Sequence, residues 1–240
     1  VRLLGIYRGI IFQASTVHEE RDIRRMLGDD VAIFNAPDLV SSKSIAMKRE
    51  EGKEKIPGYL KIIFLSRISR KKNLDGSLHM LKGVQGNLEF NIYGPVDDEE
   101  YWQQCRKIID DIPENIRVRY HGDIQHGEVI ETMSRHDLFF LPTHGENFGH
   151  VILEALVAGC PVLISDQTPW RDLAKKGVGW DLPLENLEEF TKVITECVEM
   201  DKISHEILSR NAREYGIQYC TRSDDVDKNF EMFNQALQRR

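Results

Sequence analysis

Two glutamates, Glu146 and Glu154, bracket a stretch whose residue types could bind a phosphorylated ligand that also carries hydroxyl groups. The apolar run 137–141 before it suits a buried parallel strand, and apolar residues from Phe148 onward recur at the spacing of an amphipathic helix. Glu146 is therefore expected just before a helix, and Glu154 two turns into it, about 9 Å further along the axis. His150 shares the flank of Glu154.

A helix start attracts phosphate because its first N–H groups lack intrahelical partners and carry a partial positive charge. Gly149 permits close approach of a ligand to the backbone. The amides predicted to cradle a diphosphate are those of Phe148, Gly149, His150 and Val151. Glu146 would then meet ligand hydroxyls, and Glu154 would hold a ribose diol. An arbitrary glutamate pair more often marks a solvated helix face, so the assignment depends on the surrounding sequence.

The elements that position these residues alternate between strand and helix from Tyr59 onward. This pattern predicts an α/β fold with a Rossmann-like, doubly wound parallel sheet and helices on both faces. Ligands bind such sheets beyond the carboxyl ends of the strands. We expect strands at 61–66, 88–93, 116–120, 137–141 and 161–165. We expect helices at 73–82, 99–110, 128–134, from 148, at 169–175, 187–200, 204–215 and 224–238.

The flanking segments suggest a division of the chain. A strand at 10–14, a helix at 19–26 capped by Ser15 or Thr16, and a strand at 31–34 precede the polar, charged segment 41–57, which has linker composition. The final helix carries an apolar stripe of Val226, Phe230 and Phe233. We therefore expect a first segment at 1–40, a linker at 41–57, a main domain at 58–220 and a terminal helix at 221–240.

A loop after the strand 61–66 gathers four cations, Arg67, Arg70, Lys71 and Lys72. Basic side chains in a loop that follows a strand would point at the ligand crevice, where a phosphorylated ligand carries negative charge on its phosphate oxygens. In a site without metal, an arginine fork and a lysine point charge would stabilise that charge. Taken alone, such a run would more often be a solvated charge cluster.

Together these features resemble the signature of the retaining glycosyltransferases of the GT-B fold, family four, also described as glycosyl transferases group 1. The resemblance is carried by Glu-Asn-Phe-Gly at 146–149, Glu-Ala-Leu at 154–156 and Gly-Cys-Pro-Val at 159–162. It covers roughly residues 10–235. The resemblance implies that the chain is the C-terminal, donor-binding half of a GT-B fold, and that 1–40 is a remnant of the N-terminal acceptor domain. The terminal helix would cross back to that first domain.

The resemblance also implies roles for individual residues. Glu146, Arg67 and Lys72 would be catalytic, whereas Arg70 and Lys71 are left unassigned. Gly94 and Ile124 lie in two loops that would read the nucleotide base, largely through backbone groups. The remaining donor-binding residues would be Glu154, Asn147, Phe148, Gly149, His150 and Val151. No metal and no cofactor is expected, since the nucleotide-diphosphate sugar is a substrate.

The chain departs from the family pattern after the strand 161–165. Many relatives have a glycine pair there, close to the donor sugar and phosphate, whereas this chain has Asp166, Gln167 and Thr168. Ser66 likewise stands where a glycine commonly precedes the arginine. Trp170 is expected to pack beneath the loop as part of the core.

The composition argues against some classes of binding partner. A formal net charge of −7 argues against a general nucleic-acid binder. The four cysteines show no metal-site spacing and indicate reduced thiols, so we expect a cytoplasmic protein. No apolar run approaches the ~18 residues of a membrane span. Peripheral contact with the inner face of the membrane, through parts outside this chain, is left open.

The sequence therefore predicts a glycosyltransferase that moves a sugar from a nucleotide-diphosphate sugar to a glycan, polysaccharide or glycolipid acceptor with retention of anomeric configuration. This chain would supply donor binding, and a missing N-terminal domain would contact the acceptor glycan or lipid-linked sugar. Two alternatives are a nucleotide-sugar epimerase on the same fold and a non-catalytic sugar-nucleotide-binding module. The nucleotide, sugar, linkage and oligomeric state are not specified by the sequence.

Overall fold

The computed structural model describes residues 10–37, 55–221 and 223–238. Contacts divide the chain into two compact units, of which unit 1 comprises 1–41 and 218–240 and unit 2 comprises 42–217. Most of the predicted linker lies outside the described residues. Lys55, which the prediction placed in that linker, is buried in unit 2 and donates to the carbonyls of Ile56, Tyr59 and Val198.

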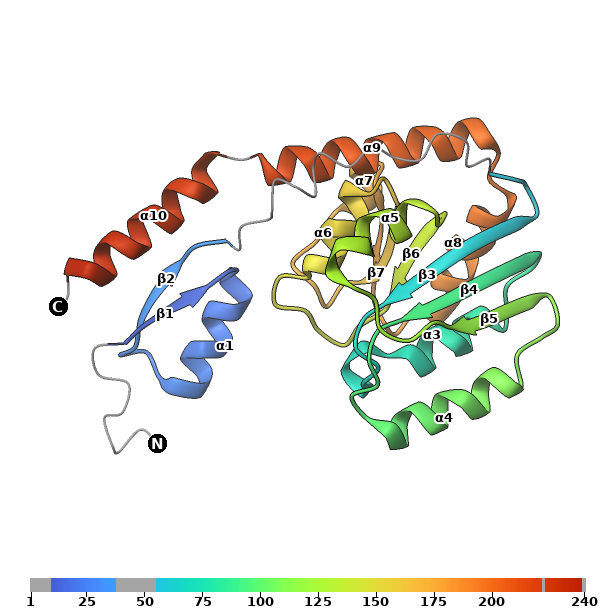
Figure 1. Cartoon of the computed structure of the whole chain (residues 1–240), viewed down its shortest axis with the longest axis horizontal. Helices are drawn as coiled ribbons and strands as arrows, with labels where there is room; N and C mark the ends of the chain where they lie inside the picture. The colour runs from blue at the N-terminus through green and yellow to red at the C-terminus, as the bar shows by residue number, and fades with distance from the viewer. Residues whose placement is uncertain (1–9, 38–54, 222, 239–240) are drawn as a thin grey trace. The chain divides into compact units, whose positions relative to one another are not determined.

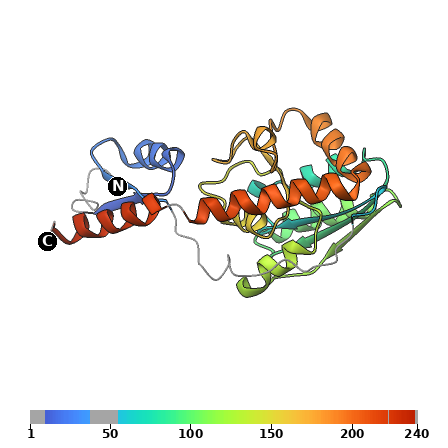
Figure 2. The ribbon, with the colours of Figure 1, turned by 90° about the horizontal axis from the view of Figure 1, so that it is seen from above.

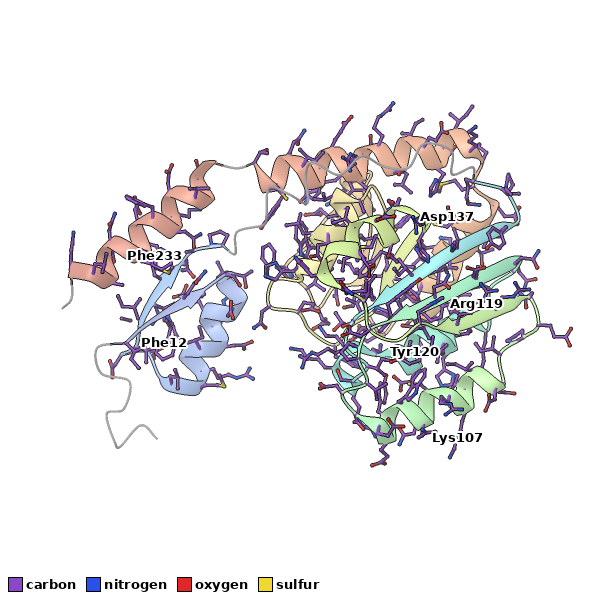
Figure 3. All side chains as sticks on the ribbon, viewed as in Figure 1. Phe12, Lys107, Arg119, Tyr120, Asp137 and Phe233 are labelled. Carbon is purple, nitrogen blue, oxygen red and sulfur yellow. The ribbon has the colours of Figure 1, made fainter. Side chains whose placement is uncertain are left out.

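Unit 1 contains a two-stranded parallel sheet with β1 at Ile11–Ala14 and β2 at Ala32–Asn35, and helices α1 at Val17–Leu27 and α10 at Ser223–Gln238. Thr16 caps α1, because its Oγ1 accepts from the amide of Glu19, and the Glu19 carboxylate in turn accepts from the amide and hydroxyl of Ser15, one residue before the cap. Asn229 on α10 donates to the carbonyl of Pro37. The predicted stripe on α10 is exposed rather than packed, with Phe233 62% exposed (Figure 3).

Unit 2 is built on a six-stranded, all-parallel sheet in the order β5-β4-β3-β6-β7-β8 (Figure 1). The strands are β3 Tyr59–Leu65, β4 Asn87–Tyr93, β5 Ile116–Tyr120, β6 Leu138–Leu141, β7 Val162–Ser165 and β8 Gly179–Leu182. The predicted Rossmann-like α/β fold is confirmed. Strand β8, at the edge of the sheet beside β7, was not predicted.

Helices cover both faces of this sheet. They are α3 Leu74–Leu81, α4 Glu99–Asp110, α5 Val129–Ser134, α6 His150–Val157, α7 Leu173–Lys176, α8 Leu187–Glu199 and α9 Lys202–Cys220, with short 3-10 turns η2 at Arg70–Lys72 and η3 at His126–Glu128. Helix α3 packs against α4 and α8, and α5 packs against α6. A row of aromatic ring contacts joins the sheet to α8 through Phe64, Phe90, Phe140 and Phe190. Burying each ring stabilises the fold by about 1.5–3 kcal/mol.

Helix α9 runs along unit 2 and is fixed to it by side chains that bond to backbone carbonyls (Figure 2). His205 contacts the carbonyl of Asp137, which lies just before β6 at the amino end of the sheet (Figure 3). Ser209 and Arg213 donate to the carbonyls of Gly159 and Val157. None of the helices in the described part of the chain has the length and apolar character to cross a membrane.

The strand order reverses between β3 and β6, which pair at Ile62–Leu138 and Ile63–Phe139. From β3 the chain proceeds outward to β4, whereas from β6 it proceeds the other way to β7. The loops that leave the carboxyl ends of two such strands diverge and open a crevice, which is where doubly wound sheets bind ligands. The two loops that leave the carboxyl ends of β3 and β6, and would therefore line such a crevice, are residues 66–73 and 142–149.

Candidate functional site

Hydrogen bonds join the loop after β3 to the loop after β6. The carbonyl of Lys71 accepts from the amide of His144 at 2.8 Å and from Thr143 Oγ1 at 2.9 Å. The side-chain amide of the buried Asn73 donates to the carbonyl of Pro142 at 2.8 Å. Asn73 adopts a left-handed conformation with φ 59°, which Asn tolerates better than most residues, and so ends the loop just before α3.

These bonds bring two of the predicted catalytic residues together. Lys72 Nζ and Glu146 Oε1 form an ion pair, with side chains only 12% and 14% exposed. The backbone of Glu146 is also held, because its amide donates to the carbonyl of Gln167 at 3.1 Å. A lysine and a glutamate 74 positions apart thus share one sheltered position at the reversal point of the sheet.

Arg67, the third predicted catalytic residue, is engaged elsewhere. Its Nη1 lies 3.3 Å from Asp97 Oδ2 in the loop after β4, and its side chain is 65% exposed. Arg70 contacts Asp98 and lies over the ring of Tyr101, at 5.3 Å from the ring centroid. The structure therefore places Lys72 against Glu146 but directs Arg67 and Arg70 toward the loop and helix that follow β4.

The helix start predicted at Phe148 is two residues later, since α6 begins at His150. Gly149 precedes it with φ 81°, a left-handed backbone conformation that favours glycine, and a Cβ there would lie 2.8 Å from the end of the Ile152 side chain. The Phe148 carbonyl, one residue before this glycine cap, accepts from Trp170 Nε1 at 2.6 Å. Trp170 is buried, as predicted, and also anchors the start of α6. Asn147 is exposed and Val151 half-buried beside this start.

Glu154 lies on α6 with its side chain 14% exposed, and its Oε1 is 3.6 Å from His126 Nδ1. Burial raises the pKa of Glu154, and the nearby His126 and His150 oppose that shift. The predicted proximity of His150 to Glu154 fits this arrangement. The role of His126, on η3 in the loop after β5, was not foreseen, because nothing in the sequence links that loop to α6.

The two loops assigned to the base lie beside each other at the same edge. Gly94 has φ 125° and donates to the carbonyl of Gly122 at 2.8 Å, and a Cβ at Gly94 would lie 2.0 Å from the carbonyl oxygen of Ser66. The backbone amide of Ile124 donates to Asp123 Oδ1 at 2.9 Å. A base that used the Ile124 amide would have to displace that carboxylate.

The loop after β7, where the sequence departs from the family pattern, has a structural role. Ser165 Oγ donates to the carbonyl of Thr143, and Gln167 supplies the carbonyl that holds Glu146. The Gln167 side chain donates to Asp166 Oδ1 at 2.6 Å. Within the described residues, no group of three or more His, Cys, Asp or Glu side chains is arranged to hold a metal ion.

The arrangement is chemically suited to an anionic ligand that also carries hydroxyl groups. Lys72 and the start of α6 would attract the negative charge of the ligand. The carboxylates of Glu146 and Glu154 would accept hydrogen bonds from its hydroxyls. Lys72 is already paired with Glu146. A dianionic ligand could therefore pair with Lys72 only by displacing the Glu146 carboxylate from it.

Comparison with known families gives one extended match. A sequence model described as "Glycosyl transferases group 1" matches residues 47–215, which is more than half of the chain.

Two curated proteins show the same likeness. The chain is 26% identical over 184 residues to "Sulfoquinovosyl transferase SQD2" of Arabidopsis thaliana, covering 73% of this chain and 34% of that protein. It is 25% identical over 157 residues to "Phosphatidyl-myo-inositol mannosyltransferase" of Mycobacterium leprae, covering 63% and 40%. The chain therefore spans two fifths or less of the length of these relatives.

Solved structures share the fold. The S. aureus TarM G117R mutant, crystallised in complex with Fondaparinux, alpha-GlcNAc-glycerol and UDP, aligns with a TM-score of 0.71 at 18% identity. The alignment covers 92% of this chain and 43% of that one.

Proposed function

This chain belongs to the glycosyl transferases group 1 family, and from that premise we propose that it forms the donor-binding half of a retaining glycosyltransferase. The donor is a nucleotide-diphosphate sugar bound beyond the carboxyl ends of β3 and β6. The observation that carries the proposal is the sheltered Lys72–Glu146 pair at the reversal point of the sheet. It provides one group for the leaving phosphate and one for the sugar at the same place.

Donor binding exchanges the partners of this pair. The diphosphate replaces Glu146 at Lys72, and Glu146 then turns its carboxylate to the sugar, where it stabilises positive charge at the anomeric carbon. A sheltered lysine aimed at developing negative charge lowers the barrier by about 3 kcal/mol, the magnitude typical of one such group. Arg67 adds a second cation once it leaves Asp97.

The bond that breaks joins the anomeric carbon to the phosphate oxygen, which keeps the electron pair. The acceptor oxygen attacks from the same face, and its proton passes to the departing phosphate. Retention follows because the new bond forms on the face that the leaving group vacates. The amides of Gly149, His150 and Val151 at the start of α6 support the diphosphate, with Asn147 and Phe148 positioning that start.

Glu154 accepts hydrogen bonds from the ribose hydroxyls, further along α6. Its carboxylate is sheltered, so each hydrogen bond from a hydroxyl to the charged group contributes about 1.5–3 kcal/mol. Gly94 and Ile124 provide backbone groups for the base. Because protein cations carry the phosphate charge in this mechanism, transfer is proposed to need no metal and to persist in excess chelator.

Acceptor contacts are proposed to come from outside unit 2, with a glycan or lipid-linked sugar as acceptor. The name of one relative, a phosphatidyl-myo-inositol mannosyltransferase, includes a phosphatidyl lipid and supports a lipid-linked acceptor. We therefore propose a cytoplasmic enzyme with peripheral membrane contact.

Calorimetry of the chain with UDP, GDP and ADP tests donor binding, and the expected result is micromolar to millimolar affinity for one of them. Transfer is tested in a full-length protein with labelled donor and the variant Glu146→Gln. Loss of transfer with retained nucleotide binding supports the assignment. Intact transfer in that variant contradicts the catalytic role of Glu146, and binding without transfer in the unaltered protein indicates a binding module instead.

A further inference from the structure

The loops after β3 and β4 are held side by side by their backbones. The amide of Ile68 donates to the carbonyl of Pro95 at 2.9 Å, and the amide of Asp97 donates back to the carbonyl of Ile68 at 3.1 Å. At Gly94, just before these bonds, a side chain would collide with the carbonyl of Ser66. The position of Asp97 beside Arg67 is therefore imposed by backbone pairing and does not depend on their charges.

The contact between the two side chains is itself weak. One guanidinium nitrogen of Arg67 lies 3.3 Å from one oxygen of Asp97, and the side chains are 65% and 49% exposed. An exposed single-contact pair of this kind contributes little to stability and is readily exchanged for a better anion. Asp97 is thus held near Arg67 by the backbone, but its carboxylate binds the guanidinium only weakly.

The charge of the ligand changes during the proposed reaction. A nucleotide-diphosphate sugar has one negative charge on each phosphate, whereas the free nucleoside diphosphate gains a second charge on its terminal phosphate above its pKa of about 6. Cations arranged around the phosphates therefore hold the product more tightly than the donor. Tight product binding limits turnover wherever release is the slow step.

We propose that Asp97 speeds release of the nucleoside diphosphate by competing with it for Arg67. While donor is bound, Arg67 contacts the diphosphate; as product leaves, the tethered carboxylate recaptures the guanidinium and blocks rebinding of the phosphate. Asp97 acts through Arg67 and is a positioning residue. The inference rests on the proposed function, because it requires a diphosphate at Arg67.

Four variants of the chain test this idea: Asp97→Asn, Arg67→Ala, the double variant, and Asp111→Asn as the control. Asp111 pairs with Lys82 at 2.6 Å at the other end of α4, and so its substitution makes the same change in net charge about 18 Å along the helix. Affinity and dissociation rate are measured for UDP and UDP-glucose, or for the matching GDP or ADP pair if one of those binds instead.

The expected result is that Asp97→Asn tightens nucleoside diphosphate binding by about two- to fivefold at low salt, mainly through slower dissociation. The gain is smaller for the nucleotide sugar, disappears when Arg67 is alanine, and shrinks at ~1 M salt. Asp111→Asn behaves as the unaltered chain.

Three results would overturn the inference: no gain from Asp97→Asn although Arg67→Ala weakens binding, an equal gain for diphosphate and nucleotide sugar, or the same gain from Asp111→Asn. Failure of the proposed function gives a different result, because then none of the three diphosphates binds the unaltered chain.

Discussion

At the scale of single residues, the charged groups assigned to the candidate site each lie against another protein side chain. Lys72 is paired with Glu146, Arg67 with Asp97, and Glu154 lies beside His126. Each pair contains a group that we assign to the donor and a protein group that a donor would displace. The net affinity for donor is therefore the difference between two sets of interactions.

A first prediction follows for the Lys72–Glu146 pair. Glu146→Gln leaves Lys72 without its anionic partner, so the variant should bind the nucleoside diphosphate at least as tightly as the unaltered chain. Lys72→Met keeps the apolar stem but removes the charge, and should weaken binding about tenfold or more. Calorimetry measures both. Equal weakening in the two variants would mean that Glu146 acts in binding by holding Lys72 in place.

A second prediction concerns Glu154 and pH. Burial raises its pKa in the folded chain, so its ionisation disfavours folding at pH values above the folded pKa and has no effect below the unfolded pKa, where both states are protonated. Glu154→Gln should therefore stabilise the chain at neutral pH in the absence of nucleotide, and its Tm should rise by about 2–4 °C for each kcal/mol of stability gained. The gain should fade as pH drops through the folded pKa.

Thermal unfolding of both proteins across acid to neutral pH is the measurement, and nucleotide affinity is the accompanying control. The same variant should bind the nucleoside diphosphate more weakly, because ribose loses a charged acceptor. A variant that is less stable at neutral pH would contradict the description of Glu154 as a carboxylate under a burial penalty.

The residues of the candidate site were predictable only in part. Glu146 and Lys72 could be assigned to one pocket, because motif and topology place both beyond the carboxyl ends of strands. Their direct contact could not be predicted, since it depends on the hydrogen bonds that join Lys71 and Asn73 to the loop after β6. The partners Asp97 and His126 left no sequence signal, because both lie on separate loops that only the folded sheet brings near.

At the scale of elements, Trp170 connects the loop after β7 to the start of α6. Its ring packs against Phe148 with centroids 5.8 Å apart, and its Nε1 donates to the Phe148 carbonyl. Gly149 follows in a left-handed conformation with φ 81° and caps α6, which begins at His150. A buried indole thus holds the residue just before the cap of α6, where we propose that backbone amides bind phosphate.

A third prediction tests this connection. Trp170→Phe keeps an aromatic ring but removes the hydrogen bond that Nε1 donates to the Phe148 carbonyl, which should cost about 0.5–1.5 kcal/mol of stability and also weaken diphosphate binding. Trp102→Phe is the matched control, since Trp102 is buried on α4 against Tyr120, with ring centroids 4.7 Å apart. The control should lose stability but retain affinity. Unchanged affinity in Trp170→Phe would show that α6 starts correctly without the indole.

The elements themselves were largely predictable where local and tertiary preferences agree. Helix α4 has the predicted bounds, because Asp98 caps it and two glutamates occupy its first turn. Strand β8 was missed because Gly179–Leu182 is only four residues long and contains one glycine and one charged residue. Its strand conformation is stabilised by pairing with β7, which a local pattern does not report.

At the scale of the whole molecule, the proposed donor site lies entirely in unit 2. Every residue assigned to the donor falls between Arg67 and Glu154, and the chain contacts define 42–217 as a compact unit. The ring cluster of Phe64, Phe90, Phe140 and Phe190 gives this unit a core of its own. Independent folding of the unit is therefore expected.

The fourth prediction is that a fragment comprising 42–217 unfolds cooperatively and binds the nucleoside diphosphate within about twofold of the whole chain, a difference of about 0.4 kcal/mol. Calorimetry on both proteins, together with thermal unfolding of the fragment, is the measurement. A folded fragment with much lower affinity would mean that 1–41 or 218–240 contributes to the donor site.

The attachment of α9 restricts which changes in chain length unit 2 can tolerate. His205, Ser209 and Arg213 follow one another at intervals of four residues, so they point to the same side of the helix. Inserting a single residue ahead of His205 rotates all three together, whereas an insertion between Ser209 and Arg213 turns one contact about 100° away from the others. Natural length variation in this family should therefore be found at the turns on either side of α9 and be absent from its interior.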